Sequence, residues 1–155
     1  LELSKKYILK VFHQASTENF DNLKNFYYKN NIENELFNYN DNILKFMSQS
    51  NICITRAGAS TLAELIFLNL AHITIPLPSA KDNHQFENAL FYKNKGCSWI
   101  INQNETNKKN LTEKLFNIIE NKSEYSDKKK NMKNFNYQNT WNNINQKIIT
   151  TINEN

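Results

Sequence analysis

One short segment of this 155-residue chain gathers residues suited to binding an anion. Thr55–Thr61 reads TRAGAST and contains the only arginine, Arg56, and one of the two glycines, Gly58. A glycine at a strand-to-helix turn lets a ligand approach the backbone closely. The helix N-terminus behind it would offer free N–H groups that attract phosphate. The segment lacks the GxxxxGK[ST] and GxGxxG patterns, so it indicates an anion site without naming the ligand.

The same residues allow a purely structural interpretation. Thr61 and Glu64 stand three positions apart, which is the spacing of a capping box. Glu64 would then bond to the N-cap N–H, and Gly58 would be a plain turn residue. On the pattern alone, the capping box is favoured over the anion site.

A second segment, Pro76–Ala89, also follows an apolar run and opens a helix-like pattern. Asp82 and Gln85 have the spacing of a cap and its partner. The segment carries several polar side chains that could hydrogen-bond a polyhydroxylated ligand: Asp82, Asn83, His84, Gln85 and Asn88. The alternative is a solvated first turn with His84 exposed and idle, and the residues leave both interpretations open.

Strand-like and helix-like patterns alternate along the chain and must position these two segments. Apolar runs predict strands near residues 7–12, 33–38, 51–55, 72–76 and 98–101. Helical spacing predicts helices over 17–29, 41–48, 60–68, 82–95, 107–121, 124–135 and 141–152. Asp41 is a candidate N-cap, and Gly96 is expected just after a helix end, where glycine is common.

This alternation predicts an α/β fold with one parallel sheet and right-handed crossovers. We expect a doubly wound, Rossmann-like sheet within a single domain spanning residues 1–155. Such sheets bind ligands beyond the carboxyl ends of their strands. Both polar segments follow strands, so both are expected at that edge.

The composition narrows the class of protein. Apolar residues form 39% of the chain and aromatic residues 12%, which is too many for a disordered chain, and no apolar run is long enough for a transmembrane helix. The net charge of +4 is carried by scattered lysines, densest at Lys128–Lys130. This cluster is interpreted as a solvated helix face, with attraction to an anionic membrane or nucleic acid as the alternative.

Cys53 and Cys97 form no metal-binding pattern and are predicted to be buried, reduced thiols of a cytoplasmic protein.

Taken together, the two segments resemble a known family. RAGASTLAEL (Arg56–Leu65), an apolar strand ending in proline, and DNHQFENA (Asp82–Ala89) are similar to R-[SA]-G-A-x-T-x-x-E and D-x-x-Q-x-x-N-A of the MurG-type transferases, glycosyltransferase family 28. His13–Gln14 and Tyr39–Ile43 also resemble family landmarks. The resemblance covers nearly the whole chain and implies the C-terminal, donor-binding domain of a two-domain GT-B glycosyltransferase.

The resemblance implies a reaction and a location. N-acetylglucosamine would move with inversion, and without a metal or cofactor, from UDP-N-acetylglucosamine to undecaprenyl-pyrophosphoryl-muramoyl-pentapeptide. This converts lipid I to lipid II in peptidoglycan synthesis, which serves cell shape and division. The intact enzyme would be cytoplasmic and peripheral at the inner membrane. It would bind no nucleic acid.

The implied substrate-binding residues divide by the part of the donor that they would contact. They are Glu64 for the ribose; Gly58, Ala59, Ser60 and Thr61 for the diphosphate; Asn40 and Ile43 for the uracil; His84, Gln85 and Asn88 for the sugar; and Arg56 at the rim of the cleft.

The chain also departs from the family. The family's first strand of this domain, the glycine-rich loop after it and the acceptor-binding N-terminal domain are missing, and His84 stands where many members carry glutamine. The missing domain supplies acceptor binding, membrane association and the expected general base. We therefore expect a donor domain that is incomplete at its N-terminus, has no assigned catalytic residue and does not transfer sugar alone.

Three other functions remain open from the residues. The chain could be the donor-binding subunit of a split two-chain transferase, docking through the helices near 60–70 and 141–152. It could be a nucleotide-binding module that catalyses nothing. A nucleic-acid binder is the weakest alternative, because arginine is almost absent and no aromatic-basic motif occurs.

Overall fold

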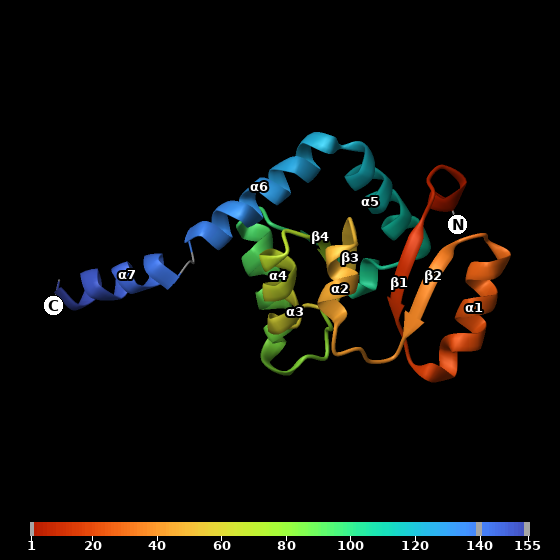
Figure 1. The fold of residues 1–155 in the computed structure, drawn as a ribbon, viewed down its shortest axis with the longest axis horizontal. Coiled ribbons are helices and arrows are strands. Elements are labelled where there is room, and N and C mark those ends of the chain that lie inside the picture. Colours follow the sequence, from red (N-terminus) through yellow and green to blue (C-terminus); the bar gives the residue numbers. More distant parts are fainter. Residues whose placement is uncertain (1, 139–140, 154–155) are drawn as a thin grey trace. The chain divides into compact units, whose positions relative to one another are not determined.

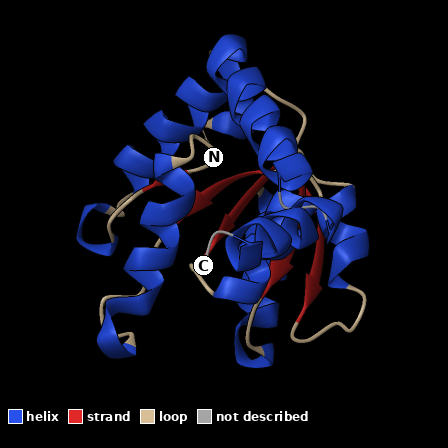
Figure 2. Ribbon diagram, turned by 90° about the vertical axis from the view of Figure 1, so that its left-hand side faces the viewer, coloured by secondary structure: helices blue, strands red, loops and turns tan. Residues whose placement is uncertain are grey.

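A computed structural model describes residues 2–138 and 141–153. The chain divides into two compact units, Leu1–Phe46 and Met47–Asn155. Figure 2, with helices in blue and strands in red, shows that the strands are short and that helices make up most of the chain. Each unit is a parallel βα arrangement of its own.

The first unit is built around two strands. β1 (Lys10–Gln14) and β2 (Glu33–Phe37) pair in parallel and are connected by α1 (Phe20–Lys29). Their first residue pair is Lys10 and Glu33, whose charged groups lie 2.6 Å apart. Short 3-10 helices precede β1 and α1, at Leu3–Lys5 and Thr17–Asn19. α2 (Ile43–Ser48) runs across the boundary between the units.

The second unit carries a three-stranded parallel sheet in the order β3-β4-β5. β3 (Ile52–Thr55), α3 (Ala59–Phe67), β4 (Ala71–Thr74), α4 (His84–Asn94) and β5 (Trp99–Ile100) follow one another along the chain (Figure 1). Three helices complete the unit: α5 (Lys108–Glu120), α6 (Lys122–Gln138) and α7 (Trp141–Asn153). Short 3-10 helices at Lys81–Asn83 and Gln103–Glu105 precede α4 and α5.

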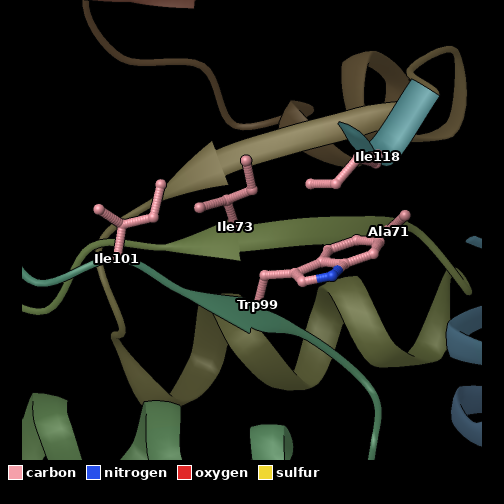
Figure 3. Packing of buried hydrophobic residues seen from close by; sticks show 5 residues of the cluster. All are labelled: Ala71, Ile73, Trp99, Ile101 and Ile118. Carbon is pink, nitrogen blue, oxygen red and sulfur yellow. The ribbon is translucent and has the colours of Figure 1, made fainter. Parts of the chain in front are cut away.

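The core of this unit lies between the sheet and α5. Ala71, Ile73, Trp99 and Ile101 pack with Ile118 of α5, as Figure 3 shows. Because side chains alternate across a strand, the neighbours of Ile73, His72 and Thr74, face the opposite side. Ile66, Cys97 and Met132 form a second buried cluster. Helices therefore cover both faces of the sheet.

α6 is held to the sheet by polar as well as apolar contacts. The Trp99 indole donates to Glu124 Oε1 at 2.5 Å, and Tyr125 Oη donates to the Asn51 carbonyl at 2.9 Å. Lys128 Nζ, from the predicted lysine cluster, lies 5.3 Å from the centre of the Trp99 ring. Lys128 therefore contacts an aromatic side chain of the core and is not only a solvated surface charge.

The predicted α/β class with parallel strands is confirmed, while several boundaries differ. The first strand begins at Lys10, not near residue 7, because a 3-10 helix at Leu3–Lys5 precedes it and the ladder with β2 starts at the Lys10–Glu33 pair. Gly96 follows α4 with a φ of 69°, as predicted for a helix end. Asp41 is not an N-cap, because α2 begins only at Ile43 and the Asn40 side chain bonds to the Asn42 N–H instead.

The expected single sheet is also corrected. Among the described residues, the strands form two separate sheets, one of β1 and β2 and one of β3, β4 and β5.

Both cysteines are free thiols, as predicted, although only Cys97 is fully buried. Burial raises the pKa of Cys53 to about 11, which keeps this thiol protonated at neutral pH. In the part of the chain that the structure describes, no helix has the length and apolar character needed to cross a membrane.

Candidate functional site

The N-terminus of α3 is an open helix end. Gly58 is its N-cap, with φ −68° and ψ 136°, and no side chain of the described residues caps the helix. The first intrahelical bond runs from Leu62 N to the Gly58 carbonyl at 3.0 Å. The N–H groups of Ala59, Ser60 and Thr61 precede it, so they have no partner within the helix. These N–H groups and the positive end of the helix dipole suit an anion.

Among the residues that the structure describes, none requires glycine at position 58. Its backbone angles are open to any residue, and an added Cβ would meet only Thr61 Oγ1, at 3.8 Å. A Cβ at position 58 would therefore fit without a clash, and close approach of a ligand to this backbone stays a prediction.

Glu64 is not part of a capping box, so the structural interpretation favoured by the pattern is wrong. α3 begins at Ala59, which makes Thr61 its third residue and places Glu64 in the second turn. The half-buried Glu64 carboxylate has no hydrogen-bond or ion-pair partner among the residues that the structure describes. Residues three and four apart share a helix face, so Glu64 lies on the face of Ser60 and Thr61. It is an acceptor available to hydroxyl donors.

The second polar segment is held differently from the prediction. α4 begins at His84, and the two residues before it, Asp82 and Asn83, have φ of 52° and 55°. Gln85 does not pair with Asp82 as a cap, because its Oε1 accepts the Leu77 N–H at 3.0 Å. The side chain thereby fixes the loop after β4 to the start of α4.

His84 is exposed, but one of its ring nitrogens is engaged. Nδ1 lies 2.6 Å from the Lys81 carbonyl. Because a carbonyl only accepts, Nδ1 must carry the proton of this bond. Nε2 remains the ring nitrogen available to a ligand.

Asn88 connects the two polar segments. Its Nδ2 donates to the carbonyl of Ala57 at 3.1 Å, across 31 positions of sequence. Ala57 is fully buried next to Gly58. The first turns of α4 thus fix the loop that carries the open end of α3.

Arg56 spans the carboxyl ends of the strands. Its Nη1 donates to the Ile75 carbonyl at 3.1 Å and to Gln103 Oε1 at 2.8 Å. Beside it lies a cavity of about 350 Å³ lined by Ile54, Thr55, Arg56, Ile75, Gln103 and Thr106. Sequence reasoning missed Gln103. It could have been found, because it follows β5 and the ends of parallel strands share one edge.

Asn40 and Ile43 belong to the first unit and its boundary helix. β2 ends at Phe37, so Asn40 lies in the loop that follows this strand. Its side chain accepts the Asn42 N–H at 2.8 Å, just before Ile43 begins α2. In the same unit, Gln14 ends β1 and donates to the Asn38 carbonyl at 2.9 Å.

A buried polar row supports the sheet under α3. Cys53 of β3 pairs in register with His72 of β4, and Ser98 directly precedes β5. His72 Nδ1 bonds to the Leu70 carbonyl at 2.8 Å. Among the described residues, His72 Nε2 and Ser98 Oγ are buried without a partner. Burial lowers the pKa of His72 below its ordinary value of 6.5, since a charged imidazole would lose its hydration.

The fold and the open helix end define a doubly wound α/β domain suited to an anionic ligand at the carboxyl edge of its strands. Residues 1–144 match the glycosyltransferase family 28 C-terminal domain. The chain belongs to that family.

Relatives and a solved structure agree with this assignment. The chain is 58% identical, over its whole length, to the UDP-N-acetylglucosamine–N-acetylmuramyl-(pentapeptide) pyrophosphoryl-undecaprenol N-acetylglucosamine transferase of Pelagibacter ubique, and spans 44% of that relative. It is 37% identical over 124 residues to the Rickettsia bellii protein of the same name, matching 80% of this chain and 35% of the relative. The crystal structure of Acinetobacter baumannii MurG has a TM-score of 0.69 and 26% identity, covering 82% of this chain and 38% of that one. The chain thus spans less than half of the relatives that it matches.

Proposed function

We propose that this chain is the donor-binding domain of a glycosyltransferase that moves N-acetylglucosamine from UDP-N-acetylglucosamine to undecaprenyl-pyrophosphoryl-muramoyl-pentapeptide. Membership of family 28 and the names of the relatives support the reaction. The observation that carries the proposal is the open N-terminus of α3 with the partnerless Glu64 on the same face.

The donor diphosphate would bind at the open helix end. The N–H groups of Ala59, Ser60 and Thr61 would donate to its oxygens, and Gly58 would let it come close. The Glu64 carboxylate would accept hydrogen bonds from the ribose hydroxyls. Charged acceptors make stronger hydrogen bonds than neutral ones, so Glu64 would contribute strongly to affinity.

The sugar would lie toward the start of α4. His84 Nε2 and the Gln85 amide group are the candidates for its hydroxyls, because His84 Nδ1 and Gln85 Oε1 are already bonded within the chain. Asn88 would act mainly by positioning, through its bond to Ala57. Arg56 at the cleft rim, and the uracil-binding role of Asn40 and Ile43, stay predictions.

In the reaction, the acceptor hydroxyl attacks the anomeric carbon and UDP leaves with its charge on the diphosphate. A preorganised helix N-terminus would stabilise that developing charge. We place no general base on this chain. In this proposal, the remainder of the enzyme binds the acceptor, contacts the cytoplasmic face of the membrane and supplies the general base. The chain alone should therefore form no lipid II from lipid I.

Glu64→Ala tests the proposal in a full-length enzyme made by joining this chain to the unmatched remainder of the Pelagibacter relative. Losing a charge-assisted hydrogen bond should weaken UDP binding by about 1.5–3 kcal/mol, measured by calorimetry. The melting temperature should hardly change, because Glu64 has no internal partner. Glu113→Ala, an exposed carboxylate on α5, is the matched control and should bind UDP normally. Unchanged UDP affinity in Glu64→Ala would refute the ribose role.

A further inference from the structure

Arg56 is held by two acceptors at the carboxyl edge of the sheet. It directly follows β3, and its Nη1 donates to the Ile75 carbonyl, just after β4, at 3.1 Å. The same nitrogen donates to Gln103 Oε1, shortly after β5, at 2.8 Å. The guanidinium is therefore fixed across the ends of neighbouring strands of one sheet.

The positive charge of Arg56 is not neutralised by these two contacts, because a carbonyl and an amide are both uncharged. The N–H groups on Nε and Nη2 have no hydrogen-bond partner among the described residues, and the side chain is exposed. A guanidinium presents its donors as a planar fork that matches the oxygens of a phosphate. Arg56 is thus an oriented cation with donors available to an anion from outside the chain.

Gln103 reaches Arg56 from a backbone that is itself fixed. It begins the short 3-10 helix before α5, and its carbonyl accepts the Thr106 N–H at 3.0 Å. The preceding carbonyl, of Asn102, accepts the Glu105 N–H at 2.9 Å and the Thr106 hydroxyl at 3.0 Å. These bonds close a tight turn around Gln103, so its side chain starts from a defined position.

The bond between Gln103 and Arg56 contributes more to orientation than to folding. Both side chains are exposed, and a hydrogen bond in contact with water adds little net stability. A free arginine side chain has many rotamers and loses that freedom when it is held by a ligand. A partner that holds it beforehand lowers this entropy cost and raises affinity.

We propose that Gln103 is a positioning residue for the transfer reaction, and that it holds Arg56 so that the free guanidinium N–H groups bind a phosphate of a substrate. The inference rests on the proposed function, in which two substrates carry linked phosphates: the donor a diphosphate and the acceptor a pyrophosphate. Both must reach the carboxyl edge of the sheet for transfer. Arg56 contacts the phosphate, and Gln103 acts only through Arg56.

Gln103→Leu tests the proposal in the full-length enzyme made with the remainder of the Pelagibacter relative. Leucine has a similar size but cannot accept the Arg56 N–H. With UDP-N-acetylglucosamine and a soluble lipid I analogue varied in turn, the KM for one or both should rise roughly 3- to 10-fold. The kcat should change less, and the melting temperature should hardly move because the lost bond is exposed.

The two KM values also identify the source of the phosphate. A rise for the lipid I analogue assigns it to the acceptor, and a rise for UDP-N-acetylglucosamine assigns it to the donor. Gln49→Leu is the matched control, since Gln49 is an exposed glutamine that precedes the amino end of β3. It should leave both KM values unchanged. Unchanged KM values in Gln103→Leu would overturn the proposal.

A double-mutant cycle separates positioning from a direct or purely structural role. Arg56→Ala alone should raise the same KM roughly 10- to 100-fold, equivalent to about 1.4–2.8 kcal/mol. If Gln103 acts through Arg56, Gln103→Leu should have no further effect in the Arg56→Ala background. Additive effects of the two substitutions would overturn the proposal.

Failure of the proposed function would give a different result. An unaltered full-length enzyme that forms no lipid II from lipid I would refute the reaction itself. Calorimetry with inorganic pyrophosphate would then compare the same variants. Weaker pyrophosphate binding by Gln103→Leu would support the positioning role, and affinity equal to that of the unaltered protein would overturn it.

Discussion

The helix N-termini of α3 and α5 follow strands of the same sheet, yet they differ in how their N–H groups are satisfied. At α5, the N-cap Asn107 accepts the Asn110 N–H at 2.9 Å, and the Asn110 side chain donates to the Glu105 carbonyl at 2.8 Å. At α3, the N-cap is Gly58 and no side chain caps the helix. The end of α5 is capped by the protein itself, and in the proposed function the end of α3 binds the donor diphosphate.

Neither the amphipathic pattern of a helix nor its charge distinguishes the N-terminus of α3 from that of α5. Both helices have amphipathic sequences and both begin near the carboxyl edge of the sheet. Uncapped N–H groups cost stability, and in the proposed function the donor diphosphate would satisfy those of α3, beside a carboxylate that has no partner among the described residues. The following predictions are ordered from the largest expected effect to the smallest.

Adding a capping side chain to α3 should make its N-terminus resemble that of α5 and abolish the proposed anion binding. Gly58→Asp adds a carboxylate that can cap the helix, and the space for its Cβ exists. The added charge and bulk should repel the diphosphate and weaken UDP binding by roughly 100-fold, about 2.7 kcal/mol. Stability should rise by a few tenths of a kcal/mol. Calorimetry and urea unfolding of the full-length enzyme measure the two effects, and undiminished UDP affinity would contradict the assignment of the anion site.

Acid should destabilise the fold around both helix ends, because both helices follow strands of the sheet that contains the buried His72. The pKa of His72 is lowered by burial from 6.5, so the unfolded chain takes up the proton first as the pH falls. Stability should therefore decline below about pH 6.5, by up to ~1.4 kcal/mol per pH unit for this one proton.

His72→Asn is the matched variant for this effect. Its amide can still donate to the Leu70 carbonyl but does not titrate. The variant should show a shallower loss of stability between pH 7 and acid conditions in urea unfolding. Equal slopes in the two proteins would mean that other groups cause the acid sensitivity.

Removing the cap of α5 should affect stability and leave binding unchanged. Asn107→Ala loses the bond to the Asn110 N–H and should cost about 1 kcal/mol of unfolding free energy. UDP affinity should stay the same, measured by calorimetry on the same sample. A fall in affinity larger than the fall in stability would show that the α5 end also takes part in binding.

Loosening the support of the loop before α3 should have an effect on stability similar to that of removing the α5 cap, and only a small effect on UDP binding. Asn88→Ala removes the bond to the Ala57 carbonyl and should cost roughly 0.5–1.5 kcal/mol of stability. UDP affinity should fall only slightly, because the loop stays in place but becomes less ordered. A loss as large as that of Gly58→Asp would indicate that Asn88 touches the donor itself.

Much of the fold followed from short-range patterns. The parallel βα alternation, Gly58 at a helix start and Gly96 at a helix end were predicted correctly, since periodicity and turn preference depend on neighbouring residues. The two capping-box predictions, Thr61 with Glu64 and Asp82 with Gln85, failed for a related reason. Capping spacing is satisfied by many sequences, and whether a box forms depends on where the helix begins, which was two residues earlier than Thr61 at α3 and two residues later than Asp82 at α4.

The sequence by itself determined the parallel α/β class, the family and which two segments carry polar groups at strand ends. Only the tertiary structure decided the partners of those groups: Gln85 with Leu77, Asn88 with Ala57, and Arg56 with Gln103, 47 positions away. The physical reason is that such bonds depend on which elements pack together, and chain spacing does not encode that. Only the structure shows that Glu64 has no partner among the described residues, and that the strands of the described part form two sheets.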